Sequence, residues 1–326
     1  MPEDRLHSAF RELRGSPIHR EARWLMNELY ARMGDPSRNF VKGFQSEGFH
    51  SHLFELACFA YLEEAKFRID RPIPSPDFLV IAENGFMVAV EATTANPPTG
   101  RMTDISLRSL TDLPLEEIIA KVEHEFPRRM EAIFKRKLVH NYHERPNCQA
   151  APLVLMVAPF FEAGSTTYLD ESLLDLLYGF GADDSGAIAF FDLPETAQIS
   201  GILYSNAFTV SRFLRMATDW KGLSGNIVAV REGHCFHDDD TGARYEFRFL
   251  MGATETPRET WFEGMTLFIN PNAMNPLPDG ILPCTSTFFR DGSTIVRVID
   301  GFHPLVSTMK MSVSGYEVAA TAKNNK

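Results

Sequence analysis

Two apolar segments separated by a tight turn constrain the fold of this chain most. Residues 78–81 and 86–90 are apolar throughout, and the segment between them contains Asn84-Gly85. An Asn-Gly pair favours a tight turn between antiparallel strands, because both residues adopt a left-handed backbone easily. An apolar run without alternation, as in the second segment, is typical of a strand covered on both faces. The sequence therefore predicts a β-hairpin inside a layered α/β fold.

Three acidic side chains lie at the edges of this hairpin and of the helix predicted over residues 49–66. Alternate prolines force an extended backbone that brings Asp77 to the start of the first strand, and Glu91 ends the second strand. Two carboxylates this close repel each other unless a cation neutralises them. Glu55, at the border of the helix's buried stripe, needs a metal or a lysine as partner, unless it is solvated on the helix rim. Carboxylate oxygens suit hard divalent cations, so these three residues are candidates for a metal site.

The rest of the chain alternates between strand-like and helical patterns, which indicates an α/β layer architecture. The most apolar run, residues 152–161, predicts a central buried strand. Further strands are expected over residues 186–191, 199–205 and 225–230. Helices are expected over residues 169–180 and 209–220, and two more before residue 34. Residues 115–142 are expected to form either one long helix or two short ones broken at Pro127.

The sequence suggests that the chain has three parts and that the protein is cytoplasmic. Residues 1–40 are an N-terminal helical segment, residues 41–245 the α/β core, and residues 246–326 a C-terminal elaboration, irregular and frayed at its end. Four well-separated cysteines without a CxxC pair favour reduced thiols in the cytoplasm. The sequence has no apolar run of about 18 residues and no apolar segment after its charged N-terminus, so neither a membrane span nor a signal peptide is expected.

A basic segment occupies the second half of the helix predicted over residues 115–142. The chain has 32 basic and 43 acidic residues and a net charge of −11, so a local cluster of cations stands out. Such a cluster can contact the phosphates of a nucleic acid, and it can equally be a solvated helix face. The candidate nucleic-acid contacts are Arg128, Arg129, Lys135 and Arg136.

Other motifs give competing or negative signals. Residues 234–240 combine His, Cys and Asp, which suits zinc, but no second cluster has matching spacing and a solvated turn is the competing interpretation. The sequence contains no GxxxxGKS/T, GxGxxG or GxSxG motif. Nucleotide binding through such loops and serine hydrolysis through a nucleophile elbow therefore have no support in the sequence.

The order of these elements resembles the PD-(D/E)XK nuclease superfamily. Pro76-Asp77 matches the PD element, Glu91-Ala92-Thr93 falls where (D/E)XK stands, and Glu55 matches the acidic residue often found on the first core helix. The resemblance to an uncharacterised bacterial group of this superfamily extends to residue 278 through the stretches PSPDFLV, VEATTANPP, ILYSNAFTVSRFLRM and EGMTLFINPNAMNPLP. It implies a restriction-endonuclease-like core, in which a mixed central sheet is flanked by helices.

The resemblance also implies metal-dependent hydrolysis of phosphodiester bonds in nucleic acid, with DNA as the expected substrate. Asp77 and Glu91 would hold Mg²⁺ or Mn²⁺, with the Ala92 carbonyl and Glu55 as further ligands. Duplex-cutting members often act as dimers, which leaves a homodimer open for this chain.

The chain departs from the superfamily's pattern at position 93. The motif lysine should stand there, and this chain has Thr93. Some members carry the lysine on the following helix, so Lys137 is the first candidate for this role and Lys121 the second. Thr93 and the acidic net charge keep a second hypothesis open, a catalytically inactive module for binding or assembly. A hydrolase of small phosphate esters is a third.

Overall fold

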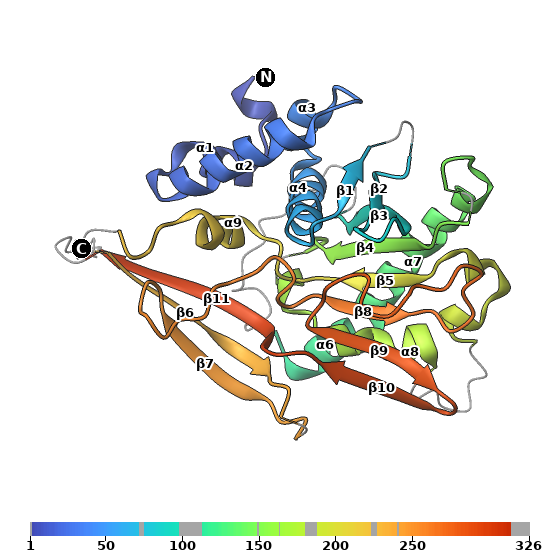
Figure 1. The fold of residues 1–326 in the computed structure, drawn as a ribbon. Coiled ribbons are helices and arrows are strands. Elements are labelled where there is room, and N and C mark those ends of the chain that lie inside the picture. Colours follow the sequence, from blue (N-terminus) through green and yellow to red (C-terminus); the bar gives the residue numbers. More distant parts are fainter. Residues whose placement is uncertain are drawn as a thin grey trace.

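The computed structural model describes residues 2–71, 75–97, 113–148, 150–162, 164–179, 188–222, 227–239 and 241–313. Within these residues the protein has a mixed α/β fold, with a large mixed sheet flanked by helices and a second, smaller sheet beside it (Figure 1). The predicted α/β class and the mixed central sheet are confirmed at this level. In the part of the chain that is described, no helix is long and apolar enough to cross a membrane.

The large sheet has the strand order β1-β2-β3-β4-β5-β8-β9-β10. Its middle pairs, β3 with β4 and β4 with β5, are parallel, as is β8 with β9, and the other neighbours are antiparallel. The strands are β1 (Arg68–Asp70), β2 (Phe78–Ile81), β3 (Met87–Ala95), β4 (Leu153–Pro159), β5 (Gly201–Tyr204), β8 (Thr266–Ile269), β9 (Ser286–Asp291) and β10 (Thr294–Ile299).

The smaller sheet is antiparallel, with β6 in its middle and β11 and β7 on either side. Its strands are β6 (Ile227–Phe236), β7 (Tyr245–Leu250) and β11 (His303–Val313). Figure 1 shows this sheet beside the large one, below helix α9 (Val210–Ala217).

Helices cover the large sheet on both faces and divide the apolar interior into two cores. One core lies under α1 (Ser8–Gly15), α2 (Arg20–Met33), α3 (Phe40–Gln45), α4 (Phe49–Glu64) and α9. The other lies under α7 (Phe126–Leu138) and α8 (Leu174–Tyr178); α7 follows α6 (Leu115–Ala120) and a π-helical turn, Lys121–Glu125. The predicted N-terminal helices are present. Residues 115–138 form one continuous helical run, in which the π-helical turn lies just before Pro127.

Strand β3 separates the two cores, because its side chains alternate between the sheet faces. Val88 and Val90 belong to the core under α4, and Ala89 belongs to the core under α7. The same alternation directs Glu91 and Thr93 towards the α7 face. Helix α4 is buried on nearly all sides, as expected for a helix enclosed between the sheet and α2.

Two predictions about the second half of the chain are wrong. The described part of segment 186–191 forms a 3₁₀ turn, Phe190–Asp192, and not a strand, because Phe190 and Phe191 both turn into the core under α7. The C-terminal third is not irregular. It contributes β7 and β11 to the small sheet, and β8, β9 and β10 extend the same large sheet that holds β2 and β3. The frayed end predicted for the chain lies outside the described residues.

Candidate functional site

Asp77 and Glu91 face each other where β2 begins. Phe78 pairs with Val90 across the hairpin, so the residues one step further out, Asp77 and Glu91, are also opposite each other. The Asp77 N–H donates a hydrogen bond to Glu91 Oε2 (3.2 Å). The Ala92 N–H donates to Asp77 Oδ2 (2.9 Å). The structure therefore brings together three of the residues that the sequence named.

Lys137 reaches this pair from α7. Its Nζ donates to Glu91 Oε1 at 2.7 Å, and the Glu91 residue is only 5% exposed. Met130 and Phe134 anchor the buried side of α7, and Lys137 lies on that same side one turn further along. Lys121, the second candidate, bonds Glu162 instead (2.6 Å). Of the two lysines that the sequence proposed, Lys137 is the one that contacts the carboxylates.

Glu55 has protein partners of its own. It forms an ion pair with Arg71, and His52 Nδ1 lies 3.0 Å from its second oxygen. The prediction that this half-buried carboxylate needs a partner is met by an arginine, which the sequence did not name. Arg71 also approaches the Asp77 carbonyl (3.5 Å), so Glu55 is linked to the site through Arg71.

The surroundings of Asp77 change its ionisation strongly. Burial, then the charges of Glu91 and Glu55, raise the pKa of Asp77 to about 8, against the opposing effects of Lys137 and the Ala92 N–H. Burial, together with the charge of Glu91 and a hydrogen bond to it, raises the pKa of the Tyr142 phenol. A proton on Asp77 therefore keeps a second negative charge from forming beside Glu91, and a divalent cation bound there would take the place of this proton.

The raised pKa of Asp77 predicts a pH dependence of stability. Folded protein keeps this proton up to about pH 8, while in the unfolded chain Asp77 ionises near its ordinary value of 3.8. Its contribution to the free energy of unfolding is thus fully present below about pH 4 and is lost as pH rises towards 8. In EDTA, we expect Asp77→Asn to remove this loss, worth on the order of a few kcal/mol.

The measurement is urea unfolding of the wild type and Asp77→Asn between pH 5 and 9, a range that includes the folded-state Asp77 pKa of about 8. Asp192→Asn is the matched control, because the Asp192 carboxylate lies near the surface with Arg290 (2.8 Å). The control should keep the wild-type slope. An identical slope in Asp77→Asn would contradict the prediction.

The donor set at this edge suits a hard cation with few protein ligands. The Ala92 carbonyl adds a third oxygen donor to the carboxylates of Asp77 and Glu91. It points to the same side of β3 as the Ala92 N–H, which is towards Asp77. The backbone groups of the odd-numbered residues of β3 point the other way, towards β4. For example, the Ala89 N–H donates to the Pro152 carbonyl, and the Ala95 carbonyl accepts from the Phe160 N–H. Within the described ranges, no group of three or more His, Cys, Asp or Glu side chains is arranged to hold a metal. Two carboxylates and a carbonyl, completed by water, match how Mg²⁺ is commonly held.

The four predicted nucleic-acid contacts lie elsewhere on α7. Three of them, Arg128, Lys135 and Arg136, are exposed, on the sides of the helix turned away from its buried face. Arg129 pairs with Glu125 (2.7 Å) and Lys135 with Glu131 (2.6 Å), each one turn earlier. The structure does not bring these side chains to Asp77 and Glu91.

Two residues at the site, Arg71 and Tyr142, had no role in the sequence prediction, whereas a third, Arg145, ends the basic stretch of residues 128–145 that the sequence marks for phosphate contacts. Arg71 binds Glu55, Tyr142 is buried beside Glu91, and Arg145 lies over the Tyr142 ring with its carbon 5.0 Å from the ring centre. Arg145 also bonds the Ser75 carbonyl (3.3 Å), which ties it to the segment before Asp77. No local pattern marks the contacts of Arg71 with Glu55 and of Arg145 with Ser75, because they join residues that are 16 and 70 positions apart.

The His-Cys-Asp tract does not form a metal site in its described residues. Cys235 is buried at the end of β6, whereas the neighbouring His234 is exposed, since the two side chains alternate across the strand. Burial raises the pKa of the Cys235 thiol. Asp238 and Asp239 are exposed after the strand, which agrees with the solvated turn. Residue 240 lies outside the described residues.

Comparisons of this chain with protein-family models, with curated proteins and with solved structures gave no match. The geometry at Asp77, Glu91 and Lys137 therefore supplies the support for a function.

Proposed function

We propose that this protein hydrolyses phosphodiester bonds in nucleic acid with the help of a divalent metal ion, on a restriction-endonuclease-like core. The observation that carries the proposal is the meeting of Asp77, Glu91 and Lys137 at one edge of the sheet. Two carboxylates and one ammonium, contributed by two strands and one helix, combine a place for a cation with a positive charge for phosphate. Oxygen-only ligands favour Mg²⁺ or Mn²⁺ over zinc.

Asp77 and Glu91, with the Ala92 carbonyl, would hold the ion. When bound there, a divalent cation would polarise a phosphate oxygen and lower the pKa of a bound water, which is the chemistry that phosphodiester hydrolysis needs. Asp77 would lose its proton when the cation arrives, so binding should strengthen as pH rises towards 8. Glu55 would join only if Arg71 released it, because that arginine now holds it.

Lys137 would stabilise the charge that develops on the phosphate. Its ammonium lies 2.7 Å from Glu91, on the sheet face towards which position 93 also points. A lysine from α7 can therefore supply the positive charge that Thr93 lacks. The ion pair with Glu91 fixes the ammonium before substrate arrives, and such preorganisation is what makes electrostatic stabilisation effective.

The substrate we propose is DNA. Arg145 bonds the Ser75 carbonyl, two residues before Asp77, and the exposed Arg128 and Arg136 could contact a backbone that runs across α7. The four cysteines are all free thiols, which suits a reducing compartment such as the cytoplasm. Whether two copies act together on a duplex is part of the same proposal and is tested by the oligomeric state on DNA.

A binding or assembly module without catalysis is the second candidate. The specific observation in its favour is the Arg71–Glu55 ion pair, which occupies the third predicted metal ligand. The bond from Lys137 to Glu91 also neutralises one of the two remaining carboxylates. A module of this kind would use the ion pairs for stability and would bind no divalent cation.

Calorimetry with Mn²⁺ distinguishes the two candidates. Wild-type protein is expected to bind the ion at one site, and the double variant Asp77→Asn with Glu91→Gln is expected to lose that binding, because the amides remove both anionic ligands. Asp192→Asn is the matched control and should bind as the wild type does, since Asp192 pairs with Arg290 away from the hairpin. Absence of binding by folded wild type, both with and without DNA, would contradict a metal-dependent nuclease.

A further inference from the structure

A cluster of buried charges joins α9 to the small sheet. Arg212 and Arg215 on α9 and Arg231 on β6 lie with Glu259 and Glu263, and all five residues are buried. Glu259 accepts two hydrogen bonds from Arg215 (2.7 and 2.8 Å), and Glu263 accepts one from Arg231 (3.0 Å). Three guanidinium groups are thus matched by two carboxylates, so the cluster holds an excess of positive charge.

The ionisation of the two glutamates does not remove this excess. Burial would raise the pKa of Glu259, but the three arginines, with Arg215 foremost, outweigh it and lower the pKa to about 2. Burial and the nearby Glu259 raise the pKa of Glu263, which favours its neutral form. Burial lowers the pKa of Arg212 only to about 10, so its charge persists at neutral pH. A buried positive charge without a matching anion is costly, and an anionic ligand would compensate it.

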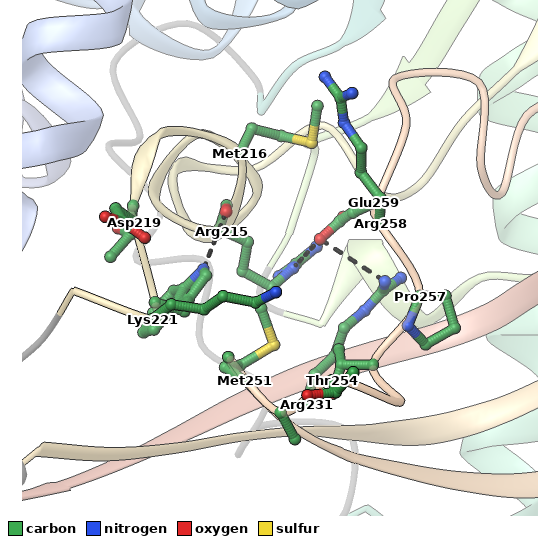
Figure 2. Close-up of a pocket in the computed structure, with 15 residues that line it drawn as sticks. Arg215, Met216, Asp219, Lys221, Arg231, Met251, Thr254, Pro257, Arg258 and Glu259 are labelled. Atoms are coloured by element: carbon green, nitrogen blue, oxygen red, sulfur yellow. Dashed lines mark hydrogen bonds and ion pairs between the residues drawn. The ribbon is translucent and has the colours of Figure 1, made fainter.

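A hollow of about 360 Å³ opens directly against this cluster. Figure 2 shows Arg215 and Arg231 meeting at Glu259, with Met216 on one side of these ion pairs and Lys221 and Met251 on the other. The remaining lining includes the exposed Arg258 and the indole of Trp220. Four basic side chains therefore line the hollow at its floor and rim, with apolar side chains between them. Two carboxylates also line it, Glu259 between the two floor arginines and Asp219, so the basic groups outnumber the acidic ones.

The two arginines at the floor keep hydrogen-bond capacity for a ligand. A guanidinium has five N–H donors. In the described part of the chain, Arg215 donates three hydrogen bonds, two to Glu259 and one to Ser211. Arg231 donates two, to Ser307 (2.8 Å) and to Glu263. Donors therefore remain on both guanidinium groups, and planar groups of this kind bind phosphate oxygens in pairs.

We propose that this hollow binds a small organic phosphate, of about the size of a nucleoside monophosphate. The phosphate would lie against Arg215 and Arg231 and between Lys221 and Arg258, where it supplies the anion that the buried cluster lacks. The organic part would pack on Met216, Met251 and Trp220, which offer apolar and aromatic surface. The volume lies within the range of ligand pockets, from roughly 300 to 1,000 Å³. None of its lining residues belongs to the Asp77 and Glu91 site, so the proposal is independent of the nuclease proposal.

Calorimetry on the full chain in EDTA tests the proposal with three probes, adenosine 5′-monophosphate, inorganic phosphate and adenosine. We expect the monophosphate to bind best, because it alone uses both the cations and the apolar wall. The double variant Lys221→Met with Arg258→Met removes the rim cations and leaves the buried cluster intact. It should weaken binding of the monophosphate by roughly tenfold or more, the loss expected for one or two charge-assisted hydrogen bonds.

Two controls identify the site. Arg248→Met with Lys310→Met removes the same charge from exposed side chains of the small sheet that pair with Glu232 and do not line the hollow. Lys137→Gln removes the ammonium of the proposed nuclease site. Both variants should bind the monophosphate as the wild type does. An equal loss in either control, equal binding of adenosine and its monophosphate, or no binding of either phosphate to the wild type would overturn the proposal.

Discussion

Replacement of Lys137 by Gln is expected to slow the proposed metal-dependent DNA cleavage by about two to three orders of magnitude, as loss of one preorganised donor to a developing charge does in other enzymes. In the described residues, Lys137 is the ammonium that contacts Glu91, at 2.7 Å. Gln can still donate a hydrogen bond to Glu91, so the carboxylate keeps a partner while the positive charge is lost. The change therefore tests the charge rather than the packing.

Lys135→Gln is the matched control for this experiment. Lys135 lies two residues earlier on α7, but its Nζ pairs with Glu131 (2.6 Å) and its side chain is 54% exposed. The control should cleave DNA within about twofold of the wild type, because an exposed ion pair contributes little. The measurement is the single-turnover rate on fluorescent duplex DNA in Mg²⁺ and in Mn²⁺, with folding checked by circular dichroism. Equal rates in folded Lys137→Gln and wild type would remove Lys137 from catalysis.

The hairpin at the site could be predicted because its determinants are local. Asn84-Gly85 sets the turn, and Gly85 has a φ of 84°, a left-handed backbone that glycine adopts without strain. The turn pairs Ile81 with Met87, and this register carries through to the start of β2. The convergence of Asp77 and Glu91 follows from that register, so it was accessible from the sequence alone.

The strands of the C-terminal third could not be predicted from local patterns, because they are short and their partners are distant in the sequence. β8 has four residues and lies between β5 and β9, and neither pairing leaves a local signature. One local signal for this region is present in the sequence. Asp291-Gly292 is a strong hairpin turn, and β9 and β10 pair across it from Asp291 and Thr294.

The partners of the site's charged groups could be predicted only in part. The analogy with nucleases that carry their lysine on a helix points to Lys137. No spacing rule in the sequence, however, predicts that its Nζ lies 2.7 Å from Glu91. The choice of Arg71 for Glu55 depends on how the segment after β1 packs against α4, which is a tertiary contact. Sequence patterns identify which carboxylates need partners, whereas the fold decides which cations supply them.

The buried cluster gives the largest expected loss of stability. Glu259 receives two bonds from Arg215 and lies 3.5 Å from Arg231 and 3.6 Å from Arg212, so it connects all three buried arginines. Glu259→Gln leaves three guanidinium charges facing Glu263 alone. Removing one partner from a buried network typically costs about 3–5 kcal/mol, because the remaining charges stay desolvated and unmatched. We expect a loss of this size in the free energy of unfolding.

Urea unfolding at pH 7 measures this loss, with Glu131→Gln as the control. Glu131 pairs with the exposed Lys135, and its removal should cost less than about 0.5 kcal/mol. The contribution of Glu259 to the free energy of unfolding should also depend on pH, because the pKa of Glu259 is about 2 in the folded protein and its ordinary value is 4.5. Its stabilisation is present above the ordinary value and is lost as pH falls towards 2, so wild type and Glu259→Gln should converge in acid. A loss at pH 7 no larger than that of the control would show that the cluster does not hold α9 to the small sheet.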